Sequence, residues 1–187
     1  MRSILFIAPV ALCLAIPVAP LSNAAAQGSL SMADRLSNDP RVDSLNVYGL
    51  RTPPDIRNDK SVQFGKSVRI SLDGHPDYWR IGITTALLKP VKKGDRIVIA
   101  FWARAEKTKD GAPGKIGRVQ LEATPVIRTI FEQPFDVSPA WKMYQLKGVS
   151  DRDCKPGELN AAMHLDSARQ VLDVGPLFVF NYGQGAS

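Results

Sequence analysis

Planar polar side chains and one indole alternate along three segments of the chain, in a pattern that suits the recognition of sugars. Trp102 and Arg104 share one side of the segment 96–105, because successive side chains of a strand point to opposite faces. The polar residues of the other two segments are Arg118, Gln120, Glu122 and His164. An indole ring stacks on the apolar face of a pyranose, and guanidinium, amide and carboxylate groups bind its hydroxyls. If the three segments are neighbouring strands of one sheet, these side chains form a row that predicts a binding face. Any antiparallel sheet with one solvated face shows the same alternation, which is the simpler interpretation.

Residue patterns typical of enzymes are weak in this sequence. Only two histidines are present, His75 and His164, and no GxSxG, HExxH or glycine-rich phosphate loop occurs. Cys154 follows Asp151 and Asp153, and these acidic neighbours do not favour a reactive thiolate. Glu122 with His164 or Arg118 could do acid–base work in a cleft. We therefore predict a protein that is not an enzyme, with a small jelly-roll polysaccharide lyase as the alternative. The residues that fit a lyase are Arg118, Gln120, His164 and Tyr144.

The segment 94–105 organises the elements that must position these side chains. It begins with the turn Gly94-Asp95, and it is apolar on both faces until Trp102 and Arg104. A strand of this kind lies centrally in a sheet, or has one face buried and the other lining a cleft. We interpret its Trp102–Arg104 end as the floor of a groove. The alternative is a central strand whose Arg104 reaches solvent.

Further strands are expected along the chain, at intervals of roughly ten to fifteen residues and separated by turns rich in Gly, Pro and Asp. The expected strands are 45–48, 62–72, 79–88, 97–103, 116–123, 141–149, 158–166 and 170–182, the last interrupted at Gly175-Pro176. Residues 51–60 are expected to form a loop. No helical period is sustained after residue 40. The predicted fold class is all-β, an antiparallel β-sandwich of the jelly-roll type.

The first residues have the layout of a secretory signal peptide. A short basic start, an apolar stretch over 4–21 and small residues before the cleavage position predict a signal peptide at 1–26. We expect a flexible arm at 27–44, in which 31–37 could form a short helix, and one jelly-roll domain at 45–187. No second hydrophobic span follows, so the sequence predicts no membrane span after cleavage and a secreted or periplasmic location. A retained membrane anchor is the alternative.

The charge of the chain limits its partners. Its 187 residues include 24 Lys and Arg against 18 Asp and Glu, a formal net charge of +6. A basic surface favours acidic partners such as uronic-acid polymers, anionic membrane or nucleic acid. Apart from a group around the turn at 89–96, however, the basic residues are scattered, so we expect no nucleic-acid partner.

Short motifs in a fixed order cover about residues 45–183. They are Phe64 to Ile70, Tyr78-Trp79, Lys93 to Asp95, Phe101 to Ala105, Trp141 to Tyr144, Gln170 to Leu177 and Asn181 to Gly183. In order and spacing the series resembles carbohydrate-binding modules of the family 4/9 (CenC-like) type, which belong to the galactose-binding-domain-like superfamily.

The resemblance implies a β-sandwich that binds glycan chains, commonly on its concave face, and often holds a structural calcium. It marks Gln170 of the final motif, with Trp102 and Arg104, as candidate groove residues, and it makes Asp173 the candidate calcium ligand. The acidic residue that the family places near the first strand is not evident around Leu45. Such modules are usually appended to a glycoside hydrolase, which a chain of this length does not accommodate.

These observations predict an exported, non-catalytic protein that recognises a polysaccharide or oligosaccharide through a concave sheet face. No cofactor is expected apart from the structural calcium that the resemblance implies. The partner protein would be a glycoside hydrolase or an envelope protein. Besides the lyase, the alternative is an envelope interaction protein on the same fold.

Overall fold

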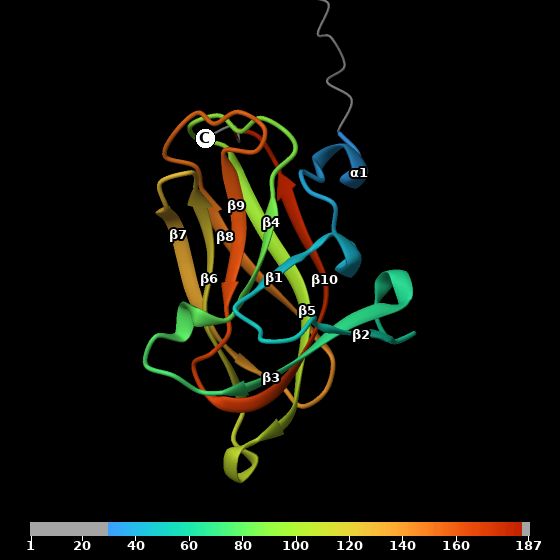
Figure 1. Cartoon of the computed structure of the whole chain (residues 1–187). Helices are drawn as coiled ribbons and strands as arrows, with labels where there is room; N and C mark the ends of the chain where they lie inside the picture. The colour runs from blue at the N-terminus through green and yellow to red at the C-terminus, as the bar shows by residue number, and fades with distance from the viewer. Residues whose placement is uncertain (1–29, 185–187) are drawn as a thin grey trace, which may run out of the picture.

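Two five-stranded antiparallel sheets lie face to face in the computed structural model, which describes residues 30–184 (Figure 1). From edge to edge, sheet A contains β2 (Asp55–Asn58), β3 (Lys66–Asp73), β10 (Arg169–Asn181), β5 (Arg96–Thr108) and β8 (Lys142–Val149). Sheet B contains, in the same way, β1 (Asn46–Tyr48), β4 (Gly82–Ala86), β9 (Leu159–His164), β6 (Gly114–Ala123) and β7 (Arg128–Val137). This arrangement confirms the predicted antiparallel β-sandwich of the jelly-roll type.

The helices are short and lie at the margins of the sandwich. They are α1 (Met32–Arg35) and the 3-10 helices η1 (Val42–Ser44), η2 (Gln63–Gly65), η3 (Tyr78–Arg80) and η4 (Lys109–Gly111). The helix α1 begins at a capping box, in which the Ser31 hydroxyl accepts from the backbone N–H of Asp34 at 3.1 Å. Within residues 30–184, none of the helices is long and apolar enough to cross a membrane.

The segment that leads into the first strand is attached to sheet A. We expected residues 27–44 to be a flexible arm, but α1 lies beside β10 (Figure 1). The side chain of Asn38 donates to the carbonyl of Leu177 at 2.8 Å and accepts from the N–H of Val179 at 2.8 Å. Because Asn38 is buried and pairs with backbone groups of β10, the part of the arm from residue 30 onward is ordered. The predicted signal peptide at 1–26 lies outside the described residues.

The inner faces of the two sheets form the hydrophobic core. In β5, Ile97, Ile99 and Phe101 alternate toward the interior and are fully buried, as the period of two in this segment predicts. The ring of Phe101 stacks on that of Tyr144 in β8, with centroids 5.5 Å apart, and meets the edge of Phe135 in β7 at 5.3 Å. These aromatic contacts join sheet A to sheet B across the core. The strand β5 lies next to the edge strand β8, whereas β10 is the central strand of sheet A.

Two strands occur where none was predicted, and both are edge strands. The strand β2 replaces part of the expected loop at 51–60, and all four of its residues are exposed, so no apolar alternation marks it. The strand β7 contains Pro134, which is tolerated at a sheet edge because that side of the strand needs no hydrogen-bond partner. The strand β10 is continuous, and its pairing with β5 shifts register between Val174 and Leu177, around Gly175-Pro176.

Candidate functional site

The seven residues predicted for ligand binding separate into three groups. The first group lies on β6 and β9 of sheet B, whose polar sides face outward. It contains Arg118, Gln120, Glu122 and His164. Trp102 and Arg104 lie on the outward side of β5 in sheet A, on the opposite face of the sandwich. The expected single row is therefore wrong, because the chain passes from sheet A to sheet B between β5 and β6. Gln170 belongs to neither face, because it points into the interior.

The outer face of sheet B brings four of the candidates together in register. On β6 and β9, Arg118 lies opposite His164, Gln120 opposite Ala162, and Glu122 opposite Asn160. On the other side of β9, His164 lies opposite Gly82 of β4, which in turn lies opposite Tyr48 of β1. One row thus crosses four strands, and its members are Tyr48, Gly82, His164 and Arg118.

Gly82 is needed in this row because Tyr48 approaches it closely. A Cβ atom at position 82 would overlap the Tyr48 hydroxyl and come within 2.6 Å of Cζ of the same ring. The ring of Tyr48 therefore lies over the backbone of β4, in space that any other residue would fill.

Two aromatic residues of η3 border the Arg118 end of the row. The Arg118 guanidinium lies over the ring of Tyr78, 5.4 Å from its centroid, and Tyr78 lies 6.0 Å from the imidazole of His164. The ring of Trp79 meets Tyr78 edge-on at 5.3 Å and is 52% exposed. Tyr78-Trp79 belongs to the motif series of the family resemblance, but it is not among the residues predicted for ligand binding. The feature of the sequence that could have identified these residues is an aromatic pair directly after a turn.

His164 has a buried polar atom beneath this face. Its Nδ1 is buried and has no hydrogen-bond partner among residues 30–184. Burial, together with the positive charge of Arg118, lowers the pKa of His164 below its ordinary value. The imidazole is therefore neutral at neutral pH, when it can offer one donor and one acceptor. Arg118 also forms an ion pair with Glu132 of β7, with 3.0 Å between Nε and Oε2, which holds the guanidinium above the sheet.

Gln120 and Glu122 form the floor of the face. The Gln120 amide donates to the Glu122 carboxylate and accepts from the Thr129 hydroxyl at 3.2 Å. Both side chains are buried, and burial raises the pKa of Glu122 although the bond from Gln120 opposes the shift. Burial and the charge of Glu122 raise the pKa of Tyr48 to about 12. These shifts indicate that the phenol and the carboxyl group share one poorly solvated region.

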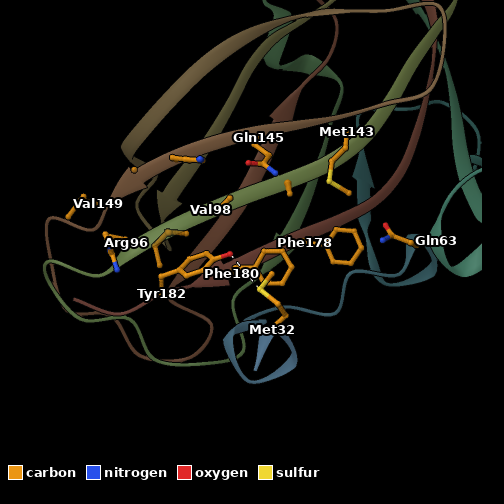
Figure 2. Close-up of a pocket in the computed structure, with 14 residues that line it drawn as sticks. Met32, Gln63, Arg96, Val98, Met143, Gln145, Val149, Phe178, Phe180 and Tyr182 are labelled. Carbon is orange, nitrogen blue, oxygen red and sulfur yellow. Dashed lines mark hydrogen bonds between the residues drawn. The ribbon is translucent and has the colours of Figure 1, made fainter. Parts of the chain in front are cut away.

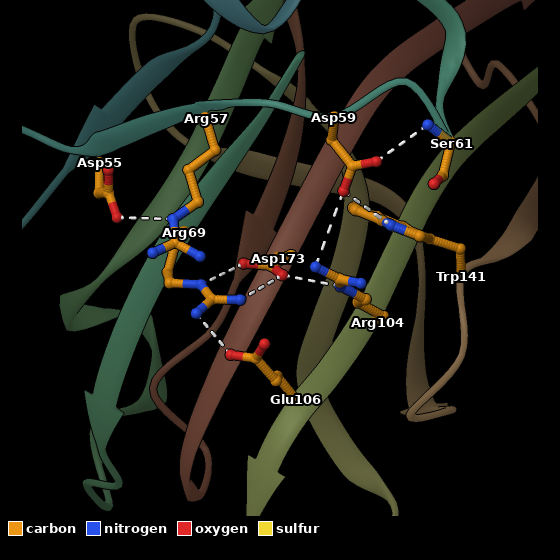
Figure 3. A network of polar contacts seen from close by, with 9 residues as sticks. All are labelled: Asp55, Arg57, Asp59, Ser61, Arg69, Arg104, Glu106, Trp141 and Asp173. Carbon is orange, nitrogen blue, oxygen red and sulfur yellow. Dashed lines mark hydrogen bonds and ion pairs between the residues drawn. The ribbon is translucent and has the colours of Figure 1, made fainter. Parts of the chain in front are cut away.

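Arg104 has a structural role on the opposite face of the sandwich. Figure 3 shows Asp173 between two guanidinium groups: Arg69 binds both of its carboxylate oxygens at 2.7 and 2.8 Å, and Arg104 donates from Nε at 2.8 Å. Arg104 also lies over the ring of Trp141 at 4.9 Å, and the Trp141 indole donates to Asp59 at 3.0 Å. This network fixes the connection between β2 and β3 to sheet A.

Asp173 does not fit the calcium site that the resemblance implies. Its carboxylate is fully buried, which by itself would raise its pKa, but Arg69 and Arg104 outweigh burial and hold the pKa below its ordinary value. Calcium requires six to eight oxygen ligands, and here two cations already occupy both carboxylate oxygens. No cluster of three or more His, Cys, Asp or Glu side chains suited to a metal ion occurs within the described part of the chain.

Trp102 and Gln170 are also committed to structural contacts. The Trp102 indole donates to the side-chain oxygen of Gln63 at 2.8 Å. Gln170 is buried, accepts from the N–H of Lys115 at 2.7 Å and donates to its carbonyl at 2.6 Å. It thereby joins the start of β6 to β10 between the sheets. Neither residue is placed to meet a ligand on the outer face of sheet B.

Comparisons with known proteins identify the fold. No family model matches the sequence, and no curated protein matches it either. A family 4 carbohydrate-binding module (CBM4) has a TM-score of 0.55 at 11% identity, over 74% of this chain and 95% of that one. The second N-terminal cellulose-binding domain of β-1,4-glucanase C from Cellulomonas fimi gives a TM-score of 0.57 at 18% identity, over 87% and 99% of the two chains. The xylan-binding CBM22-1 domain of Xyn10C from Paenibacillus barcinonensis gives 0.54 at 12% identity, over 80% and 94%. The chain therefore has the fold of a carbohydrate-binding module.

Proposed function

We propose that the protein binds a polysaccharide or oligosaccharide on the outer face of sheet B and does not transform it. The observation that carries this proposal is the group at one end of the row, where the Arg118 guanidinium lies over the ring of Tyr78 and Tyr78 meets the exposed ring of Trp79. An exposed indole ring can stack on a pyranose, and a guanidinium beside it can donate hydrogen bonds to the sugar hydroxyls. The shared fold with carbohydrate-binding modules supports the same conclusion.

Each kind of side chain on this face has a role in holding a sugar. Trp79 offers an exposed ring on which a pyranose can stack, and Tyr78 supports that ring from the side. Arg118 and His164 are planar polar groups that hydrogen-bond to hydroxyls. We propose that this is the concave face expected from the sequence.

The ligand class and location follow from the sequence and from the similar structures together. Two of the similar domains are named for cellulose and xylan, so a β-1,4-linked glycan is the first class to test. The leader-like residues 1–26 support export, and we propose a secreted or periplasmic protein. A glycoside hydrolase or an envelope protein remains the proposed partner.

A polysaccharide lyase remains the second candidate because of one observation. His164 is neutral at neutral pH and lies next to Arg118 and Tyr78, a set that could remove a proton and stabilise the resulting charge. Tyr144, which we had included in the lyase set, is buried in the core against Phe101 and takes no part.

Affinity electrophoresis tests binding, and ultraviolet absorbance tests the lyase. The full chain without residues 1–26 is run through gels that contain hydroxyethylcellulose, xylan, alginate or polygalacturonate. Retardation by at least one polysaccharide, with no rise in the absorbance of unsaturated uronic products, is the expected result. Unchanged mobility in all four gels contradicts the proposal, and a rise in absorbance replaces it with the lyase.

A further inference from the structure

A long groove crosses the outer face of sheet A, on the side of the molecule opposite the proposed glycan face. It has a volume of about 740 Å³, and β5 forms its floor between β10 on one side and β8 on the other (Figure 2). The helix α1 adds Met32 to one edge. The small Ala100 lies in the floor, directly between Phe178 of β10 and Gln145 of β8. A small residue flanked by larger ones produces the hollow.

One wall of the groove is a line of aromatic rings. Phe178 and Phe180 point outward from β10, Tyr182 directly follows the strand, and Figure 2 shows the three rings side by side. The rings of Phe178 and Phe180 are stacked, with centroids 5.9 Å apart and an angle of 5°, and Tyr182 follows Phe180 at 6.5 Å. Phe64 extends the line beyond Phe178 at 6.2 Å, from a backbone held at φ 61°. A non-glycine residue rarely adopts this left-handed conformation, so the η2 turn is specifically shaped to place that ring.

The two ends of the groove differ in charge. Arg96 and Lys147 lie at the end near Val149, both exposed, and neither forms a salt bridge with any residue in 30–184. Among the described residues that line the groove there is no carboxylate. The other end is closed by Gln63, which is held by the Trp102 indole. The groove is thus cationic at one end and uncharged at the other.

We propose that this groove binds a free, single-chain anionic amphiphile, with its carboxylate at Arg96 and Lys147 and its hydrocarbon chain along β5. Methionine and phenylalanine side chains form an adaptable apolar lining, which suits a hydrocarbon chain. The lining offers only the amides of Gln63 and Gln145 as neutral polar side chains, besides the Tyr182 hydroxyl, too few to bind the many hydroxyls of a sugar. Charge complementarity at one end selects an acid over a neutral lipid.

The dimensions of the groove set the length of the chain. The distance along β5 from Arg96 to Trp102 is six residue steps, or roughly 20 Å at the rise of a β-strand. A linear chain that lies along this floor gains about fourfold in affinity for each methylene it buries. Affinity is therefore expected to rise steeply from decanoate to myristate.

Isothermal titration calorimetry with sodium myristate below its micelle concentration tests the proposal. The double variant Arg96→Gln/Lys147→Gln is expected to bind at least about tenfold more weakly, since it loses two charged hydrogen-bond donors. Both positions are exposed, so folding is unaffected. The matched control Lys107→Gln/Lys155→Gln removes two exposed charges that do not line the groove and is expected to bind as the unaltered protein does. Ala100→Leu, which fills the floor, is expected to abolish binding.

Several results would overturn the proposal. These are no measurable myristate binding, equal affinity for myristyl alcohol, or equal weakening in the control variant. Sedimentation velocity could show dimers that persist in myristate and dissociate in Ala100→Leu. That result would show that a second copy of the chain occupies the groove instead. Loss of glycan binding in Ala100→Leu would assign the groove to sugars. Because the two sites lie on opposite faces, an Arg118→Ala/His164→Ala variant is expected to retain myristate binding, which separates this proposal from the glycan site.

Discussion

Arg118 of β6 and His164 of β9 lie directly opposite each other on the outer face of sheet B. The pairing places a permanent positive charge next to an imidazole whose Nδ1 has no partner within the described residues. It also explains why His164 stays neutral, since both burial and the guanidinium oppose its protonation. Together the two residues place two planar polar groups at one end of the row that crosses sheet B.

The first prediction concerns the buried carboxylate of Asp173. Replacement by Asn removes the fully buried carboxylate that Arg69 and Arg104 share and leaves them only Glu106 and Asp59 as charged partners. We expect the unfolding free energy to fall by about 3 kcal/mol. The control is Asp55→Asn, because the pair of Asp55 with Arg57 is exposed on both sides and contributes less than about 1 kcal/mol. Urea denaturation measures both. Equal losses in the two variants would mean that the Asp173 network does not stabilise sheet A.

Calcium is expected to have no effect on this network. The oxygens of Asp173 already accept from two guanidinium groups, so a cation would have to displace both. We predict the same Tm in millimolar calcium and in EDTA by differential scanning fluorimetry. A rise in Tm with calcium that disappears in Asp173→Asn would restore the metal site expected from the family resemblance.

The buried Glu122 makes stability depend on pH. Its pKa is raised in the folded protein, so its contribution to stability is complete below the ordinary value of 4.5 and is lost as the pH rises through the raised pKa. Glu122→Gln has no carboxyl group to ionise there. We therefore expect the variant to gain stability relative to the unaltered protein as the pH rises from about 4 to about 8. Denaturation at several pH values measures the difference, and a constant difference would show that Glu122 is well solvated.

Residues 30–44 offer a test of their attachment to β10. Asn38→Ala removes the acceptor for the Val179 N–H and the donor to the Leu177 carbonyl, and leaves buried backbone groups unpaired. A loss of about 1–3 kcal/mol is expected. Limited proteolysis is expected to cut this segment faster in the variant. Asp34→Ala, which removes only the carboxylate that accepts from Ser31 in the exposed cap of α1, serves as the control. Equal cutting of both variants would contradict the attachment.

The alternation of residues predicted most of the strands and their faces correctly. In β5 the apolar residues Ile97, Ile99 and Phe101 lie in the core, as expected. Val98 and Ala100, on the other side of the strand, form the floor of a groove, in agreement with the expectation that one face is buried and the other lines a cleft. The exposed strand β2 had no such pattern because neither of its faces is buried. The alternation of apolar and polar side chains therefore indicates which face of a strand is buried, but it does not indicate which strands pair in a sheet.

The candidate site was predicted only in part, because a local pattern does not say which sheet a strand joins. Arg118 and His164 were correctly placed on one face, and Arg104 was wrongly added to it. The roles of Arg104 and Gln170 depend on partners distant in sequence, Asp173 for one and Lys115 for the other. No spacing along the chain could reveal those contacts, whereas the exposed Trp79 could have been found from its place after a turn.

Calorimetric titration of a retained glycan into three variants tests the central claim most directly. Trp79→Ala is expected to weaken binding by about tenfold, which corresponds to the loss of one stacking contact, and Arg118→Ala/His164→Ala to abolish it. Trp102→Phe, which changes only the face of sheet A, is expected to bind as the unaltered protein does. Unchanged binding by the first two variants together with loss in Trp102→Phe would contradict the assignment of the glycan site to sheet B.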